Sequence, residues 1–299
     1  MKKVLFLAMV FVLLSVGNVY SQSQYVPGVE GLDAGSYLPK DEGLTIRLDN
    51  LFYVSDKFKN SSISNFDDFK YSHYFRAFYN GNIGILGGKW VPNINIPFVF
   101  EDLEYRNFNT SDFNVANAYI EPVAVIWEFN NFDFVFSGGL FIPTSNNKYS
   151  FSRNYMTGLI RLGGTYYLGD ENPFILTGLL SYEVNSDVFD SGVDISVGND
   201  LTLEYGIGRF ITDNIRFGGV GYAQWKVDPT DGPSTCLRPN FELNPWNVVG
   251  EAEIYALGPQ IDLEVKKWDL MVSAKSLFEF GADNRSEGIL SILSITKLF

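Results

Sequence analysis

Cysteine and histidine are almost missing from this chain, which has one of each, Cys236 and His73, in 299 residues. A lone cysteine cannot form an intramolecular disulfide, so no disulfide is expected to staple the fold. Only carboxylates then remain as metal ligands, and such a set at most suits a Ca²⁺ ion at the surface. The pairs Asp67-Asp68 and Glu101-Asp102 are better explained as solvated loop charge. The sequence therefore predicts neither a metal site nor a cofactor.

Basic residues are also scarce. Lys and Arg total 22 against 35 Asp and Glu, which gives a formal net charge of −13. Nucleic acid is bound by basic surfaces that neutralise its phosphates. We therefore expect no nucleic-acid partner.

Long apolar runs are confined to the N-terminus. The run Val4–Val16 has thirteen residues, whereas a transmembrane helix needs about 20. Lys2 and Lys3 precede the run and Val19-Tyr20-Ser21 follows it, so residues 1–21 have the form of a cleavable export signal. The residue directly after the cleavage site, Gln22, is not a cysteine, which argues against a lipoprotein anchor.

Aromatic residues, by contrast, are abundant, with 26 Phe, 17 Tyr and 5 Trp. Average hydropathy combined with many aromatics fits strands that face lipid on one side and water on the other. The alternative is a secreted all-β protein with a large aromatic core.

The main positive signal is the spacing of about twelve alternating β-segments, whose connections are by turns short and long. The short connections are Gly81-Asn82, Asn130-Asn131, Gly169 to Pro173, Thr212-Asp213-Asn214 and Lys266-Lys267. The long ones are Ser55–Phe69, Glu101–Asn117, Pro143–Tyr155, Ser186–Ser196, Asp228–Val249 and, shortest of this set, Ala282–Glu287. A barrel that crosses an outer membrane needs this rhythm, because tight turns lie on the periplasmic side and loops on the extracellular side.

The sequence therefore predicts an all-β fold, an up-and-down antiparallel transmembrane β-barrel formed by residues 44–299. We expect it in the outer membrane of a Gram-negative-type cell, surrounded by outer-membrane lipid. The barrel-assembly machinery is the expected folding partner, because a terminal aromatic such as Phe299 ends many outer-membrane strands.

Period-2 alternation distinguishes two faces in the first predicted strand, Leu44–Val54, with apolar residues on one face and Arg47 and Asp49 on the other. Arg or Lys costs roughly 2–4 kcal/mol at the midplane of a barrel's lipid face, so charged residues of the strands should face the lumen. The predicted lumen-lining residues are Arg47, Asp49, Arg161, Glu183, Glu204, Arg216, Lys275 and Glu279.

Two local irregularities stand out. The alternation is imperfect in Gly250–Val265, which predicts a bulge or an aqueous strand extension there. Glycine-rich stretches, such as Gly163-Gly164, indicate strong curvature or the close approach of something in the lumen.

Residues 22–43 precede the first strand on the predicted periplasmic side. Their prolines and glycines forbid a regular helix, so we expect an irregular segment that either plugs the lumen or hangs as a flexible tether. Glu30 and Asp33 would be natural partners for Arg47 and Arg216 if the segment enters the polar lumen.

Several fragments resemble a known family, the outer-membrane proteins named for a MetA-pathway of phenol degradation, also described as transporters. The fragments are Tyr25-Val-Pro-Gly-Val-Glu-Gly31, Leu38-Pro39, Gly43-Leu44, Glu121-Pro122 before Trp127, Pro143-Thr144 followed by Tyr149, Thr177-Gly178 with Tyr182 and Asn185, Leu257-Gly258-Pro259, and Asn284-Arg285 with Gly288. They cover nearly the whole mature chain. One departure is Ser145-Asn146-Asn147, where the family often has a glycine. The resemblance implies uptake of aromatic or other hydrophobic compounds and carries over no catalytic residue.

Catalysis has little support in the sequence. Some outer-membrane barrels are lipid hydrolases that use a Ser/His pair, but Ser72 and His73 are adjacent and would point to opposite faces of a strand. We therefore expect a protein that is not an enzyme and assign no catalytic residue.

Two function classes remain. The first is a passive channel for small hydrophobic or aromatic molecules, with Phe141, Phe151 and Tyr155 at its external mouth. The second is a structural or adhesive barrel with a closed lumen and partner-binding loops. An open path lined by aromatics would favour the first, and a sealed, charge-packed lumen the second.

Overall fold

The computed structural model describes residues 23–59, 66–105, 108–144, 154–169, 173–189, 196–231 and 252–299. The expected signal peptide (1–21), Phe151 of the expected mouth, and Cys236 lie outside these residues.

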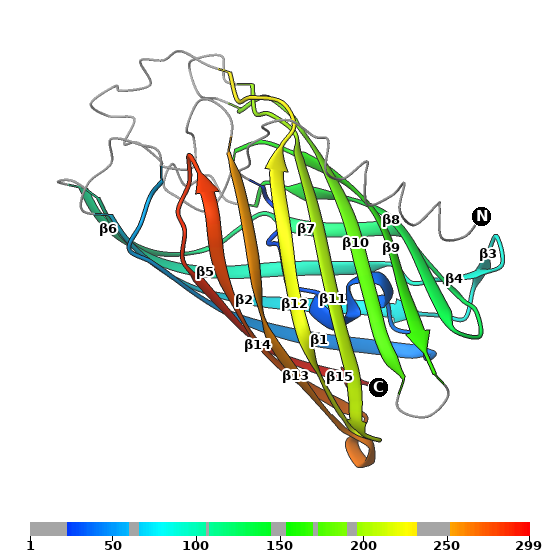
Figure 1. Cartoon of the computed structure of the whole chain (residues 1–299). Helices are drawn as coiled ribbons and strands as arrows, with labels where there is room; N and C mark the ends of the chain where they lie inside the picture. Colours follow the sequence, from blue (N-terminus) through cyan, green and yellow to red (C-terminus); the bar gives the residue numbers. More distant parts are fainter. Residues whose placement is uncertain are drawn as a thin grey trace, which may run out of the picture.

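Antiparallel strands dominate the fold (Figure 1). Their bounds are β1 (Gly43–Ser55), β2 (Asp67–Asn80), β3 (Gly84–Ile85), β4 (Gly88–Trp90), β5 (Asn93–Tyr105), β6 (Phe108–Val115), β7 (Ala118–Glu128), β8 (Phe132–Ile142), β9 (Thr157–Leu168), β10 (Phe174–Asn185), β11 (Asp200–Thr212), β12 (Ile215–Lys226), β13 (Glu253–Val265), β14 (Leu270–Asp283) and β15 (Ile289–Leu298). The described residues also include two short 3₁₀ helices, η1 (Gly31–Ser36) and η3 (Lys266–Trp268). No helix in the described ranges is long and apolar enough to cross a membrane.

Sequential strands pair with each other, and the sheet closes on itself. β1 pairs with β15, with Thr45 opposite Leu298, and β5 pairs with β7, with Asn93 opposite Glu121. In the part of the chain that the structure describes, the result is a closed antiparallel barrel of 12 strands. The predicted fold class is confirmed.

Strand residues alternate between lipid and lumen as the sequence predicts. In β1 the outward positions Leu44 and Phe52 are both 42% exposed, whereas Arg47 and Asp49 are buried inside the barrel. The exposed side chains are apolar because this face meets hydrocarbon, and the buried ones are polar because they face the lumen.

The two ends of the barrel differ, as Figure 1 shows. We call the end where the chain turns tightly, as between β11 and β12, the turn end, and the opposite one the loop end. Two predicted connections need correction. A short turn is expected at Gly81-Asn82, but a hairpin of β3 and β4 connects β2 to β5 there. β4 continues along β7 beyond the end of β2, with Lys89 opposite Ile126. The tip of the hairpin, Leu86-Gly87, has φ of 50° and 81°, the left-handed pair that suits a two-residue hairpin turn.

The second correction concerns Glu101–Asn117, predicted as a long loop. Most of this stretch is strand, because β5 runs to Tyr105 and returns as β6, with Glu101 opposite Asp112. It lacks apolar alternation because a strand that extends beyond the hydrocarbon into water needs no apolar face.

Beside the irregularity predicted in Gly250–Val265, β13 and β14 shift register at Glu253 and Tyr255. The extra residue lies on β14, where Gly281 has a φ of 63°. Glu253 therefore keeps the parity of the outward-facing residues of β13.

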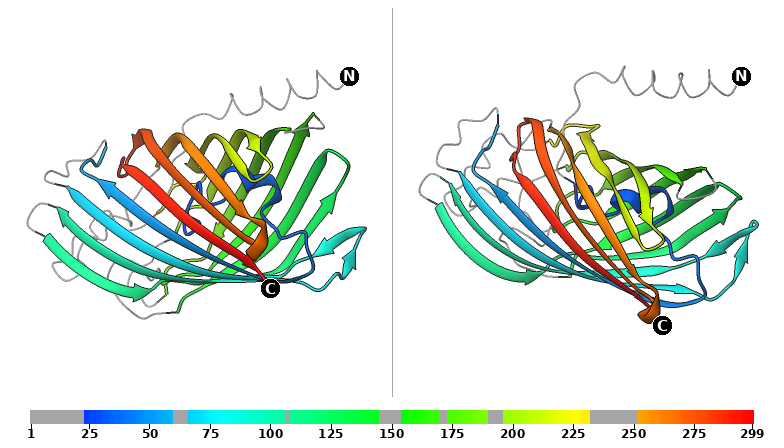
Figure 2. Two further views of the ribbon diagram at one scale, coloured as in Figure 1. Left: turned by 90° about the horizontal axis from the view of Figure 1, so that it is seen from below. Right: turned by 60° about the horizontal axis from the view of Figure 1, so that its bottom comes forward.

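The N-terminal segment (residues 23–42) lies inside the ring of strands, as the views in Figure 2 show. Its backbone comes close to that of the wall at Gly35, where a Cβ atom would stand 2.0 Å from the carbonyl group of Gly164. The interpretation of Gly163-Gly164 as a site of close approach is therefore confirmed, since any side chain at Gly35 would collide with the barrel wall.

Candidate functional site

The N-terminal segment runs along the lumen from its loop-end half to the turn end. Near its start, the Gln24 side chain donates to the carbonyl oxygen of Tyr155, which lies just before β9 at the loop end (3.2 Å). Near its finish, the amide of Asn80, the last residue of β2, donates to the carbonyl of Lys40 (3.0 Å). The segment thus occupies more of the lumen than the periplasmic mouth that its sequence position suggests.

Side chains of the barrel wall hydrogen bond to the backbone of this segment. Glu183 accepts from the N–H groups of Gln24 (3.0 Å) and Tyr25 (2.5 Å), and Thr177 accepts from Gly35 (2.7 Å). Lys275 donates to the carbonyl oxygen of Val29 (2.5 Å). Because buried backbone groups need partners, these bonds allow an irregular chain to lie in the lumen.

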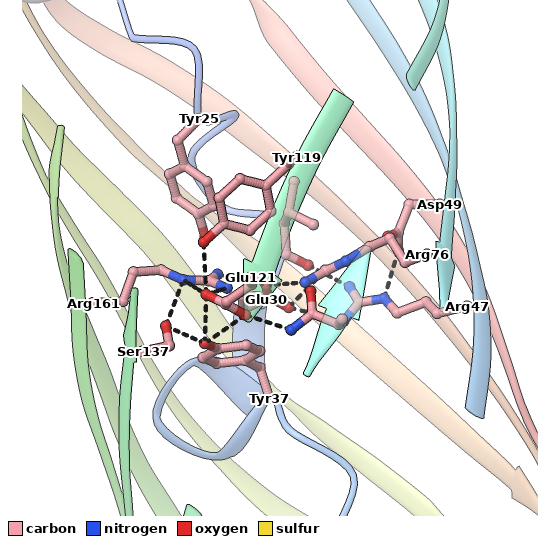
Figure 3. A network of polar contacts seen from close by, with 12 residues as sticks. Tyr25, Glu30, Tyr37, Arg47, Asp49, Arg76, Tyr119, Glu121, Ser137 and Arg161 are labelled. Carbon is pink, nitrogen blue, oxygen red and sulfur yellow. Dashed lines mark hydrogen bonds and ion pairs between the residues drawn. The ribbon is translucent and has the colours of Figure 1, made fainter. Parts of the chain in front are cut away.

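Glu30 is the centre of a polar hub in the lumen (Figure 3). Its carboxylate accepts from Arg47 (2.9 Å), Arg76 (2.9 Å) and Arg161 (3.3 Å), which come from three different strands. The carboxylate side chain is fully buried. One residue of the N-terminal segment therefore joins β1, β2 and β9.

The hub is charge-balanced. Asp49 binds Arg47 (2.7 Å) and Glu121 binds Arg161 (2.5 Å), so three carboxylates match three guanidinium groups. Burial alone would raise the pKa of Glu30, but the neighbouring arginines outweigh it and hold that pKa well below its usual range. Glu30 is therefore ionised, and removing it would leave one uncompensated positive charge.

Tyrosine hydroxyls surround the hub (Figure 3). Tyr25 donates to Glu204, Tyr119 donates to Glu121 (2.7 Å), and Tyr37 donates to Ser137 (2.6 Å). Burial, with Glu204 and Glu30 nearby, raises the pKa of Tyr25, so its phenol stays protonated and acts as a donor. The bonds of Tyr25 and Tyr37 attach the two ends of the N-terminal segment to the barrel wall, whereas the bond of Tyr119 is within β7.

A second ion pair holds the segment on the other side of the barrel. Asp33 binds Arg216 (2.7 Å), which also binds Asp262 of β13 (2.7 Å). Burial raises the pKa of Asp33, but Arg216 outweighs this effect and lowers it. Both ion pairs expected from the sequence, Glu30 with Arg47 and Asp33 with Arg216, are present.

A cavity of about 210 Å³ lies between residues 23–27 and the loop end. Much of its lining is apolar or aromatic: Tyr25, Val26, Pro27, Leu51, Tyr53, Tyr74, Pro97, Val99, Phe141, Tyr222 and Leu290. Charged groups line it too. Glu279 accepts from the hydroxyl groups of Tyr222 and Tyr53, and Lys70 is paired with Asp68 (2.7 Å). A ligand here would meet an apolar surface with a few polar groups and would rest on the N-terminal segment.

The structure places all eight predicted lumen residues inside the barrel, but not in one group. Arg47, Asp49 and Arg161 belong to the hub, and Glu183, Glu204, Arg216 and Lys275 hold other parts of the N-terminal segment. Only Glu279 lines the cavity.

Two of the residues expected at the external mouth are at the loop end of the barrel, Phe141 near the end of β8 and Tyr155 just before β9. Phe141 is buried and lines the cavity, with its ring 4.6 Å from that of Tyr119. Tyr155 is buried and does not line it.

Sequence reasoning missed Arg76, Glu121 and Lys70. The alternation of β2, with Phe69, Tyr71 and Phe75 outward, would have placed Lys70 and Arg76 in the lumen. Within the described residues, no group of three or more His, Cys, Asp or Glu side chains could hold a metal ion. Ser72 lines the cavity, whereas His73 is on the outward face of β2, so the two adjacent side chains do not meet.

Comparisons with known proteins agree with this architecture. The sequence model of one family matches residues 45–293, which is most of the chain. No curated protein matches the sequence of this chain. The COG4313 outer membrane channel from Pseudomonas putida F1 is similar in structure, with a TM-score of 0.73 and 12% identity over 89% of this chain and 98% of that chain. The transport unit of the autotransporter AIDA-I from Escherichia coli has a TM-score of 0.49 and 12% identity, over 89% and 95% of the two chains.

At 12% identity the likeness to the COG4313 channel concerns the fold alone, which is that of an outer-membrane barrel. The family match covers far more than half of the sequence. The chain is an outer-membrane β-barrel and belongs to the family described as "Putative MetA-pathway of phenol degradation".

Proposed function

We propose that this protein is a channel for the passive uptake of small hydrophobic or aromatic compounds across the outer membrane. The observation that carries the proposal is the partly apolar cavity on the loop-end side of the N-terminal segment. Family membership supports the same substrate class.

The size of the cavity suits one small ring. An apolar cavity of roughly 150 Å³ accommodates benzene, so about 210 Å³ is enough for a single monocyclic molecule. Phe141 and Tyr74 offer aromatic surface, and Leu51 and Val99 offer aliphatic surface. A compound that enters between the loops would be held here, above the N-terminal segment.

Passage beyond the cavity requires the segment to move, because Glu30, Asp33 and their arginine partners lie across the lumen. In this proposal, residues 23–42 are a plug that closes the channel at rest and shifts when a ligand competes for its contacts. The domain division follows from this role: an export signal (1–21), a plug (22–43) and a barrel (44–299).

The rival is a structural or adhesive barrel that never opens. The charge-balanced hub favours it, because a lumen filled by three buried ion pairs around Glu30 is what a sealed barrel would contain. The two functions differ in whether the plug ever leaves.

Uptake into liposomes tests the proposal. Aromatic acids, alkanes and sugars would be compared with and without the protein, and with a variant that lacks Tyr25–Gly35. We expect the intact protein to admit aromatic compounds faster than sugars, and the deletion to raise single-channel conductance in planar bilayers. A second variant, Leu51→Trp, fills the cavity and should slow aromatic uptake.

Leu48→Trp is the matched control for the cavity variant, because Leu48 is on the outward face of the same strand. If neither the intact protein nor the deletion variant transports any member of the panel, the channel function is wrong and the closed barrel is favoured.

A further inference from the structure

Three polar side chains face outward from the barrel, where apolar residues otherwise prevail. Asn50 on β1 and Tyr71 and His73 on β2 are half-buried on the lipid-facing side of their strands, and Asn50 is directly opposite His73. The hydroxyl of Tyr71 donates to Asn50 Oδ1 (2.9 Å), and His73 Nδ1 is 2.8 Å from the same oxygen. We call these three residues the polar trio.

The polar trio is inside the hydrocarbon band, not at its border. Leu48 and Phe75 face outward on the turn-end side of it, and Phe52 and Phe69 on the loop-end side. Asn50 is six residues beyond Leu44 (50 − 44). At about 3.3 Å per residue and a tilt of about 40°, it stands roughly 15 Å above Leu44, close to the middle of a band about 25 Å tall.

Hydrogen-bonding capacity is left over in the polar trio. Because Asn50 Oδ1 can only accept, the proton of a neutral His73 is on Nδ1, and Nε2 presents a lone pair. One amide hydrogen of Asn50 goes to the carbonyl of Leu293 (3.3 Å). No described residue provides a partner for His73 Nε2 or for the second amide hydrogen of Asn50. Unsatisfied polar groups are costly in hydrocarbon, where lipid tails offer nothing to bond.

A shallow hollow adjoins the polar trio on the same outward face. It is lined by residues of β12 to β15 and by Phe52 of β1, and Pro259, Ala274, Ser276 and Ser291 are the small residues among them. Ser276 and Ser291 bond to each other (2.9 Å). Small residues on a lipid-facing surface allow another protein backbone to come close.

We propose that the outward face of β14, β15, β1 and β2 is the contact surface between two copies of this chain in the membrane. A two-fold axis next to the polar trio lets the second amide hydrogen of Asn50 in each copy donate to His73 Nε2 of the other. The pairing is self-complementary, as an isologous interface requires. The hollow then receives the side chains of the opposite copy. This inference is independent of the proposed function.

Cross-linking in liposomes tests the interface. Cys236→Ser gives a cysteine-free background, in which Phe52→Cys or Phe75→Cys places one thiol beside the polar trio. Leu176→Cys is the matched control, because Leu176 faces outward from β10 on another part of the wall. With a short bis-maleimide linker, we expect covalent dimers from Phe52→Cys or Phe75→Cys at least tenfold above the control. Equal yields at all three positions would overturn the proposal.

Loss of the hydrogen bonds tests the role of the polar trio itself. The double variant Asn50→Leu, His73→Leu should lower the dimer fraction, counted by single-molecule photobleaching, at least tenfold at the same protein-to-lipid ratio. Heat-modifiable mobility on gels shows whether the double variant is folded. If the double variant is unfolded, the cross-linking experiment decides whether the interface exists. A wild-type protein that is monomeric at every ratio, with or without bound lipid, would refute the interface.

Discussion

Glu30→Gln is the sharpest test of how the plug is held. The substitution keeps the shape of the side chain and removes its charge. In the native hub, three guanidinium groups face three carboxylates, so the variant leaves Arg47, Arg76 and Arg161 against Asp49 and Glu121. The plug then loses its ionic partner at the point where it touches three strands.

The magnitude follows from burial. Glu30 is fully buried, and removing one partner of a buried ion pair costs about 3–5 kcal/mol. Glutamine retains part of the hydrogen bonding, and water that enters the lumen can solvate the arginines, so we expect the lower end of this range. Since 1.4 kcal/mol is a factor of ten, the equilibrium between docked and released plug should shift about a hundredfold.

Single-channel recording in planar bilayers measures this shift as open probability, and limited proteolysis of residues 23–42 measures it as exposure. Glu42→Gln is the control, because Glu42 is an exposed carboxylate of the same segment. Restoring the charge balance with Arg76→Gln in the Glu30→Gln background should recover part of the closure. If Glu30→Gln has the open probability and proteolysis rate of the wild type, the ion pairs of Glu30 do not hold the plug. If Glu30→Gln and Glu42→Gln have equal effects, the net charge of the segment holds the plug and the position of Glu30 does not matter.

Four further predictions use the same assays or simple chemistry. The pKa of Glu30 is lowered in the docked state. The stabilisation of the docked plug by Glu30 is therefore fully present above the ordinary carboxyl pKa of about 4.3, and it is lost only as the pH falls through the lowered pKa. Protease protection of the plug should therefore be constant from pH 7 to about 5 and fall only in strong acid; a loss near pH 6 would contradict this. Gly35→Ala should expel the plug, because its Cβ would stand 2.0 Å from Gly164, and proteolysis as slow as in wild type would show that the wall can yield. A membrane-impermeant thiol reagent should label Cys236 on intact cells, since the long connections are expected outside. Labelling only after permeabilisation would show that the barrel has the opposite orientation in the membrane. Deleting Phe299 should reduce the amount of heat-modifiable protein in the outer membrane, and an unchanged amount would remove its role in assembly.

The sequence by itself determined the strands and their faces. Alternation in a stretch such as Leu44–Val54 is a local property, and the cost of a charge in hydrocarbon decides which face is inward without any knowledge of neighbours. Arg47, Glu183 and Lys275 could be placed in the lumen for this reason. The errors at Gly81-Asn82 and Glu101–Asn117 arose where strands extend beyond the membrane and the lipid no longer constrains their pattern. The interpretation of Asp68 and Glu101 as solvated loop charge is also wrong, because both are buried strand residues paired with Lys70.

Only the tertiary structure decided which of these groups meet. Glu30 reaches Arg76 and Arg161 because the closed ring of strands brings β2 and β9 to one point of the N-terminal segment. The positions of these residues along the sequence do not predict that they meet. The polar trio likewise depends on register, since a shift of one residue between β1 and β2 would separate Asn50 from His73. Faces follow from a repeat along one strand, whereas the hub, the cavity and the proposed interface follow from how twelve strands close.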